Sequence, residues 1–313
     1  MKIIYIVLFV LPLFSINGIK QVHTNVKSKT PKQEICKPSN DGLITLPGIL
    51  NLDPVTESEG DIYSHSFESL KNWEKRKTKP RVLFENAEFS PDNVTIKNNI
   101  LNITVGYLKE KSTNCIDEFG GQVQFTKSIF SPGDEYTYSA IMKPTDKPGV
   151  VSAFFLHLID KNTNNPGYCK NNNEIDIEVV KYGHEADPSL RGKIFAYFTS
   201  WTRALNPWGY KGDPCAADPA TWDQRQRESH GIQLDERFTK EFHKYSFTWK
   251  KDEILFYIDD KFMARHTKII PQKKCPLKIN VWANQNWLGY SKNDSFTAIT
   301  QVKMVSISSK EIK

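Results

Sequence analysis

The sequence has little that would build a helical domain or a repeat array. After the first residues, no segment approaches the roughly 20 apolar residues that a membrane span needs. Apolar residues rarely recur with the period of a helix, and residues 67–73 are the best short helical candidate. No internal repeat is evident. These absences indicate a β-rich fold without membrane segments after the first residues.

Basic residues form no large cluster in the chain. The formal net charge is +6, and Lys and Arg are scattered, so no nucleic-acid partner is indicated. The sequence contains neither a Cys-x-x-Cys pair nor a His cluster, so it predicts no zinc site. A neutral polymer such as a polysaccharide fits this charge at least as well.

The N-terminal residues and the cysteines indicate a secreted protein. Residues 1–18 combine an early Lys2, an apolar run and small residues suited to cleavage, as in a signal peptide. In an oxidising compartment cysteines tend to pair, and their odd number leaves at least one free or bonded to another chain. The five are Cys36, Cys115, Cys169, Cys215 and Cys275. Asn93, Asn102 and Asn293 begin tripeptides that can accept N-glycans. We expect an extracellular, monomeric glycoprotein with disulfide bonds.

Short apolar runs separated by turn residues dominate the chain after a polar lead-in. Residues 19–60 are mostly polar, and we expect a flexible segment there. Beyond them, Gly, Pro, Asn and Asp punctuate the apolar runs. Examples are residues 100–105, 136–142, 150–158, 193–199, 244–249, 254–258, 277–282 and 302–307. This spacing predicts an all-β fold, a sandwich or jelly roll of two antiparallel sheets.

Acidic and β-branched residues alternate without a break from Glu174 to Glu178. Because successive side chains of a strand point to opposite faces, Glu174, Asp176 and Glu178 share one face. An ordinary half-solvated strand shows the same alternation. However, no Lys or Arg interrupts the acidic face, and Val179 and Val180 extend the strand as a buried one. Repulsion raises the pKa of at least one carboxyl group, so that an acid and an ionised neighbour coexist, as glycosidic bond cleavage requires.

These residues resemble the Glu-x-Asp-x-Glu signature of glycoside hydrolase family 16. The resemblance covers residues 62–308 and is strengthened by several stretches in the same order. They are similar to the family's early sheet, the strand beside the signature, a hairpin and a segment of bacterial lichenases, at residues 129–144, 149–155, 243–259 and 280–289. The resemblance implies a β-jelly roll with a sugar-binding groove across one concave sheet, formed by residues 61–313.

The resemblance also implies retaining chemistry. Glu174 would be the nucleophile, Asp176 would assist it, and Glu178 would be the general acid/base. Glu174 would attack the anomeric carbon while Glu178 protonates the leaving oxygen, and water deprotonated by Glu178 would release the glycosyl-enzyme. The two glutamates lie about 13 Å apart at Cα on an extended strand. This spacing is compatible with retention without establishing it, so both roles rest on the resemblance.

Aromatic residues are the candidates for binding sugar rings, although most aromatics of a β-sandwich belong to its core. Phe154 and Phe155 are neighbours on a strand, so one is expected in the core and the other in the cleft. We expect the cleft to be lined by Phe155, Phe198, Trp201, Asn280, Trp282 and Trp287. The long, turn-rich segment 202–229 is expected to wall it.

The sequence therefore predicts a secreted endo-β-glucanase that cuts β-1,3-1,4- or β-1,3-linked glucan. Two alternatives stay open. One is a transglycosylase of the xyloglucan or chitin–glucan type, which passes the same intermediate to a sugar acceptor. The other is a β-glucan-binding recognition protein without turnover, ranked lowest because all three acids are present. We expect no required cofactor. A structural calcium ion is frequent in the family, but no ligand set for one can be assigned. The expected partner is a polysaccharide, neither nucleic acid nor a membrane.

Overall fold

A computed structural model describes residues 61–77, 87–107, 118–128, 135–160, 171–203, 226–291 and 295–310. All of these residues belong to a single compact unit. The predicted signal peptide, the polar lead-in and four of the five cysteines lie outside the described ranges, as does most of segment 202–229. Predictions about these parts stay predictions.

The described residues form sixteen strands and three short helices. The strands are β1 (Asp61–His65), β2 (Trp73–Lys75), β3 (Ala87–Phe89), β4 (Val94–Lys97), β5 (Ile100–Tyr107), β6 (Glu118–Ser128), β7 (Glu135–Lys143), β8 (Val150–Asp160), β9 (Asn171–Lys181), β10 (Ile194–Arg203), β11 (Gln226–Leu234), β12 (His243–Trp249), β13 (Ile254–Ile258), β14 (Lys261–His266), β15 (Pro276–Ala283) and β16 (Phe296–Lys310). The helices are the 3-10 helix η2 (Pro91–Asn93), α1 (Arg237–Lys240) and α2 (Gln285–Leu288). None of these described helices has the length and apolar character to cross a membrane.

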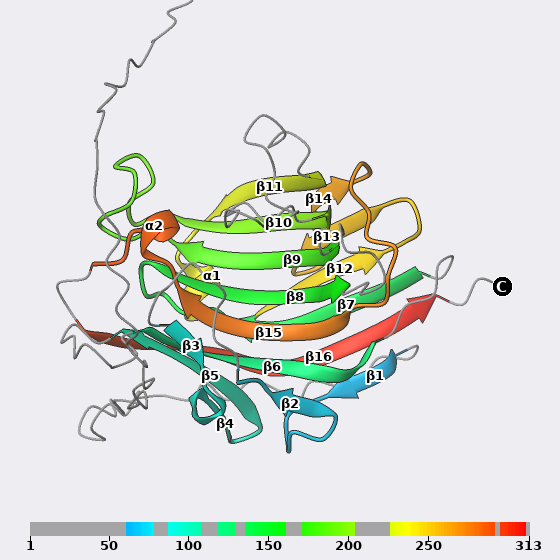
Figure 1. Cartoon of the computed structure of the whole chain (residues 1–313), viewed down its shortest axis with the longest axis horizontal. Helices are drawn as coiled ribbons and strands as arrows, with labels where there is room; N and C mark the ends of the chain where they lie inside the picture. The colour runs from blue at the N-terminus through cyan, green and yellow to red at the C-terminus, as the bar shows by residue number, and fades with distance from the viewer. Residues whose placement is uncertain are drawn as a thin grey trace, which may run out of the picture. The chain divides into compact units, whose positions relative to one another are not determined.

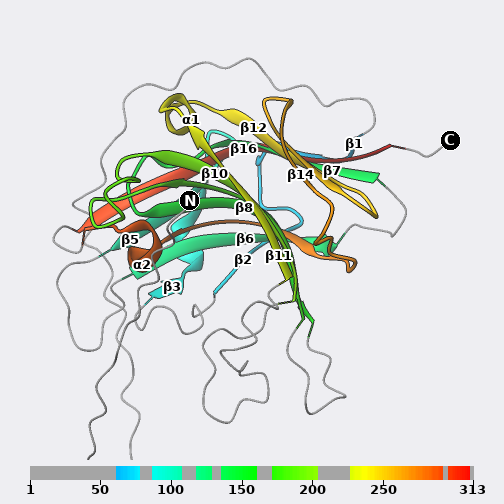
Figure 2. The same cartoon turned by 90° about the horizontal axis from the view of Figure 1, so that it is seen from above.

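The strands follow one hydrogen-bonded path in the order β11-β10-β9-β8-β15-β6-β5-β16-β7-β12-β13-β14. Neighbours along it are antiparallel, and the path folds over at β6, which pairs with β15 in one layer and β5 in the other. Figure 1 shows the curved layer that carries β8, β9, β10 and β15, and Figure 2 shows the second layer lying against it. The predicted all-β, jelly-roll-like architecture is confirmed.

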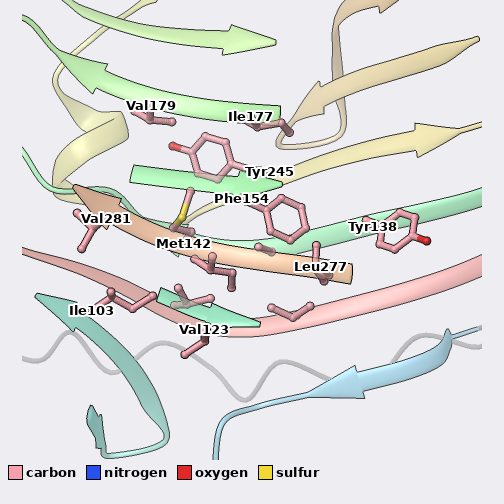
Figure 3. Packing of buried hydrophobic residues seen from close by; sticks show 14 of the residues in the cluster. Ile103, Val123, Tyr138, Met142, Phe154, Ile177, Val179, Tyr245, Leu277 and Val281 are labelled. Carbon is pink, nitrogen blue, oxygen red and sulfur yellow. The ribbon is translucent and has the colours of Figure 1, made fainter. Parts of the chain in front are cut away.

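The core lies between the two layers and is built from alternate residues of each strand. Phe154 of β8 pairs in register with Ile177 of β9, and both side chains are fully buried. From the opposite layer, the ring of Phe247 lies 5.6 Å from that of Phe154. Figure 3 shows Phe154 and Ile177 with other members of this cluster. Each such side chain stabilises the fold by about 1.5–3 kcal/mol on burial, so the faces that point inward are fixed.

Residues 67–73, the best helical candidate in the sequence, do not form a helix. The segment forms bends and a turn, with positive φ angles of 52° at Phe67 and 67° at Asn72 that interrupt a right-handed helix. Phe67 is fully buried, and its ring lies 5.6 Å from Trp73. Packing of these two aromatics in the core therefore overrides the weak local periodicity.

A hydrogen-bonded chain, buried at Ser200 and His266, joins an edge of one layer to an edge of the other. Ser200 Oγ of β10 lies 2.8 Å from His266 Nδ1 of β14, and His266 Nε2 lies 3.0 Å from His230 Nδ1 of β11. Ser200 and His266 have no exposed surface. Burial lowers the pKa of His266 to about 4, so its imidazole is neutral at neutral pH.

Acid should weaken the fold through His266. The unfolded chain binds a proton at this side chain near pH 6.5, whereas the folded protein binds it only near pH 4. The free energy of unfolding should therefore fall as pH drops through this window, by up to about 3 kcal/mol. We expect His266→Gln to lose part of this decline in urea unfolding at pH 7 and pH 4.5. His184→Gln, at an exposed position, is the control, and equal declines in both variants would contradict the assignment.

Candidate active site

Strand β9 presents the three acids on one face, as the alternation predicts. Its neighbours are β8 and β10, and Ile175 and Ile177 are fully buried on the core side. The acids lie on the side of the layer that points away from the core. On this side, Glu174, Asp176 and Glu178 pair in register with His157, Phe155 and Ala153 of β8 and with Trp201, Thr199 and Tyr197 of β10. We call this side of the layer the acid face.

The acids interact strongly because they are close and largely withdrawn from water. Asp176 is only 6% exposed, and it shares a side-chain hydrogen bond with Glu174. Burial, followed by the charges of Glu174 and Glu178, raises the pKa of Asp176 well above its usual range. The raised pKa favours the protonated form of Asp176, which can donate in the hydrogen bond that it shares with Glu174. The acid face can thus keep one carboxylate ionised beside a neutral neighbour.

Glu178 is tuned to change its charge near neutrality. Burial raises its pKa to about 7, and the negative charge of Glu174 adds to the rise, whereas the guanidinium of Arg227 opposes it. A carboxyl group with this pKa can give up a proton and take it back at neutral pH.

Sequence reasoning missed two cations that neighbouring strands bring to the acid face. Arg227 of β11 lies with its guanidinium 4.9 Å from the ring centroid of Trp201. Lys278 of β15 donates from Nζ to His157 Nδ1 at 2.7 Å. Neither strand is adjacent to β9, since β10 and β8 intervene. Only the strand order could have revealed these cations, because their sequence distance from the signature gives no signal.

Most of the predicted sugar-binding residues lie on the acid face. Phe155 pairs with Asp176, Trp201 pairs with Glu174, and Phe154 points into the core as the strand alternation requires. Asn280 and Trp282 of β15 lie opposite Ala153 and Val151 of β8, in the same phase as Phe155. The ring of Trp287 lies 6.5 Å from that of Trp282. Four of the six predicted residues therefore share this face, and Trp287 lies beside it.

The expectation for Phe198 is wrong. Phe198 pairs with Ile177, has no exposed surface, and packs 5.2 Å from the ring of Phe256 in the core. Its neighbour Tyr197 takes the place on the acid face and pairs with Glu178. The Tyr197 hydroxyl lies 2.6 Å from that of Tyr182. A one-residue difference in strand phase separates the two, and aromatic character alone could not set it.

Asn280 has an unused acceptor. Its side chain is 7% exposed, and Nδ2 donates to Gln122 Oε1 at 3.3 Å. Its Oδ1 atom is buried without a hydrogen-bond partner among the described residues. A buried acceptor without a partner costs about 1–3 kcal/mol, which a ligand hydroxyl can remove.

A short helix holds Trp287 beside the acid face. Asn284 caps the N-terminus of α2, and its Oδ1 accepts from Trp287 N at 2.8 Å. Gly289 ends the helix with a φ of 64°, where a side chain would clash with the backbone of Ala186. The cap at one end and the glycine at the other fix the orientation of the tryptophan. Its ring lies 5.8 Å from that of Tyr197.

The described residues include a free thiol but no cluster of metal ligands. Within the described ranges, no group of three or more His, Cys, Asp or Glu side chains is placed to hold a metal ion. A structural calcium site stays a prediction. Cys275 is a buried free thiol, consistent with the odd number of cysteines, and burial raises its pKa to about 12.

Comparison with known sequences points to one family. A family model described as glycosyl hydrolases family 16 matches residues 219–297. A β-glucanase of Acetivibrio thermocellus is 28% identical over 226 residues, which cover 69% of this chain and 53% of the relative. A probable xyloglucan endotransglucosylase/hydrolase of Arabidopsis thaliana is 27% identical, covering 55% of this chain and 44% of the relative. The chain spans about half the length of the curated relatives it matches.

Solved structures share the fold. A lichenase from a mouse hindgut metagenome superimposes with a TM-score of 0.55 at 21% identity, covering 79% of this chain and 98% of that one. The β-glucanase of Bacillus licheniformis gives a TM-score of 0.56 at 18% identity over 81% and 100%. An endo-β-1,3-glucanase from Pyrococcus furiosus gives 0.57 at 19% identity over 80% and 94%. The resemblance noted in the sequence is confirmed at the level of the fold.

The coupling between the two glutamates can be measured without a substrate. Removing the negative charge in Glu174→Gln should lower the pKa of Glu178 from about 7, by about one pH unit. Carbon-13 NMR titration of labelled glutamate carboxyl groups would show the change. Glu236→Gln removes an exposed carboxylate that is paired with Lys240 and should leave the Glu178 titration unaltered. An unaltered titration in Glu174→Gln itself would contradict the coupling.

Proposed function

We propose that this chain is a member of glycoside hydrolase family 16 and that it is a secreted, retaining endo-β-glucanase. Its substrate is β-1,3-1,4- or β-1,3-linked glucan. The observation that carries the proposal is the acid face of β9, where Asp176, with a raised pKa, lies between two glutamates. Double displacement needs a nucleophile and a proton donor side by side.

The charge state of the acids supports a division of labour. Asp176, whose pKa is raised, can donate its proton in the hydrogen bond that it shares with Glu174 and so orient the nucleophile. Glu174 attacks the anomeric carbon, and the glycosidic bond breaks as the proton of Glu178 passes to the leaving oxygen. Water then attacks the glycosyl-enzyme and gives a proton to Glu178, which restores both carboxyl groups.

The same coupling suits Glu178 to both steps. The charge of Glu174 helps to raise the pKa of Glu178 to about 7 in the free protein. When Glu174 becomes an ester, this charge is lost and the pKa of Glu178 falls. Glu178 is therefore a proton donor before the glycosidic bond breaks and a base afterwards. Loss of the Glu174 charge on formation of the ester therefore converts Glu178 from an acid into a base.

Substrate binding is supported by the surface that flanks the acids. The rings of Phe155, Trp282 and Trp287 lie on or beside the acid face, and Asn280 offers its unpaired Oδ1. Aromatic rings stack on the apolar faces of sugars, and a buried acceptor selects a hydroxyl. The glucan class is supported by relatives that are themselves named β-glucanases.

Loss of either glutamate should abolish hydrolysis. We expect Glu174→Gln and Glu178→Gln to lower kcat/KM on lichenan and laminarin by about a thousandfold or more, with circular dichroism unchanged. The exposed Glu236→Gln is the matched control. Near-normal activity in either active-site variant would contradict the proposal.

Azide can assign the two roles separately. With an aryl oligoglucoside that needs no protonation of its leaving group, azide replaces the missing nucleophile in Glu174→Ala and yields an inverted glycosyl azide. In Glu178→Ala, azide instead intercepts the glycosyl-enzyme and yields a retained glycosyl azide. Proton NMR of the anomeric centre separates the outcomes, and the opposite pattern would exchange the roles.

A second candidate is transfer of the glycosyl group to a sugar. The stacked pair of Arg227 and Trp201, beside Glu174, offers a flat surface to an acceptor, and one relative is named a probable endotransglucosylase/hydrolase. A fluorescent cello-oligosaccharide incubated with xyloglucan or lichenan should stay small if water is the acceptor. Its incorporation into polymer without new reducing ends would favour transfer, and Trp201→Ala should then reduce the incorporation.

A further inference from the structure

We propose that Lys278 is a positioning residue that balances the charge of Glu174 and is held in place by His157. The inference rests on the proposed function, in which Glu174 is the nucleophile. Lys278 lies opposite Phe155 across the β15–β8 pair, and His157 lies opposite Glu174 across the β8–β9 pair. The lysine and the nucleophile therefore approach the same histidine from two sides.

The hydrogen bond between Lys278 and His157 fixes the direction of the ammonium group. An ammonium has no lone pair, so it donates, and His157 Nδ1 must accept at 2.7 Å. His157 is then neutral with its own proton on Nε2. The ammonium also lies 5.9 Å from the ring centroid of Phe155. A side chain that is usually flexible is thus held by two contacts from the strand next to the nucleophile.

The charges around Lys278 explain why a cation is tolerated there. Burial lowers the pKa of Lys278 to about 8, and the charge of Glu174 is the largest opposing influence. Arg76 adds to the lowering, whereas Cys275 and Asp176 oppose it. Glu174 is therefore the principal anionic partner of this cation.

The two cations of the acid face act on different carboxyl groups. Arg227 opposes the raised pKa of both Asp176 and Glu178. Lys278 interacts chiefly with Glu174. Arg227 therefore acts on Asp176 and Glu178, and Lys278 acts on the nucleophile Glu174. Loss of the Lys278 charge should make ionisation of the carboxyl groups harder without removing any catalytic atom.

A substrate-free measurement tests the link between Lys278 and Glu174. Nitrogen-15 NMR of the lysine Nζ groups should show a pKa of about 8 for Lys278. In Glu174→Gln this pKa should fall further, because the largest opposing charge is gone. Glu236→Gln should leave it unchanged. An unchanged value in Glu174→Gln would overturn the inference, and this result would hold whether or not the protein cleaves glucan.

Kinetics test the consequence for catalysis. Lys278→Met keeps an unbranched apolar side chain but removes the charge. We expect a kcat about tenfold lower and an acidic limb of the kcat/KM profile that moves up by about one pH unit, with the urea midpoint little changed. Lys278→Arg restores a cation and should recover most of both effects. Lys244→Met, which removes a surface cation paired with Asp260, is the control.

Two outcomes would overturn the kinetic part. A Lys278→Met variant with a higher KM, normal kcat and unmoved pH profile would show that the lysine only binds substrate. A variant with no change in any constant would show that it only packs over Phe155. If the wild-type protein cleaves none of the glucans tested, the proposed function fails, while the NMR result still decides the charge coupling.

Discussion

Everything at the candidate site depends on the crowding of three carboxyl groups on one face of a buried strand. Burial and mutual repulsion raise the pKa of Asp176 and Glu178, and the raised pKa values suit these carboxyl groups to proton transfer. The strand tolerates this repulsion because its other face is anchored by Ile175 and Ile177 in the core. Stability gained from the apolar face thus supports a destabilising set of charges on the opposite face.

The two layers divide the work between stability and chemistry. The core side of β8, β9 and β10 packs against Phe247 and Phe256 of the second layer. The acid face of the same strands carries the carboxyl groups and several aromatic side chains, and the cations come from β11 and β15 beside them. Because strand residues alternate, each substitution near the signature affects one of these properties and largely spares the other. Tyr197 and Phe198, adjacent in sequence, illustrate the separation.

The charged groups that interact on the acid face are spread over five neighbouring strands, from β11 to β15. Arg227 comes from β11 and Lys278 from β15, and both act on acids of β9 across an intervening strand. A cation directly beside each acid would form a tight ion pair and hold all three carboxyl groups ionised. Cations placed one strand further away moderate the repulsion while leaving Glu178 a pKa of about 7. The spacing of a β-sheet therefore sets how strongly the charges compete.

The sequence alone determined the all-β architecture, the common face of Glu174, Asp176 and Glu178, and the opposite orientations of Phe154 and Phe155. These follow from the two-residue period of a strand, which is a local property. The sequence-based prediction was wrong at Phe198, because choosing between adjacent aromatics needs the phase of pairing with β9. It also failed at residues 67–73, where core packing of Phe67 overrode local periodicity. Only the tertiary structure brought Arg227, Lys278 and His157 to the acids, since strand order joins residues that sequence distance does not relate.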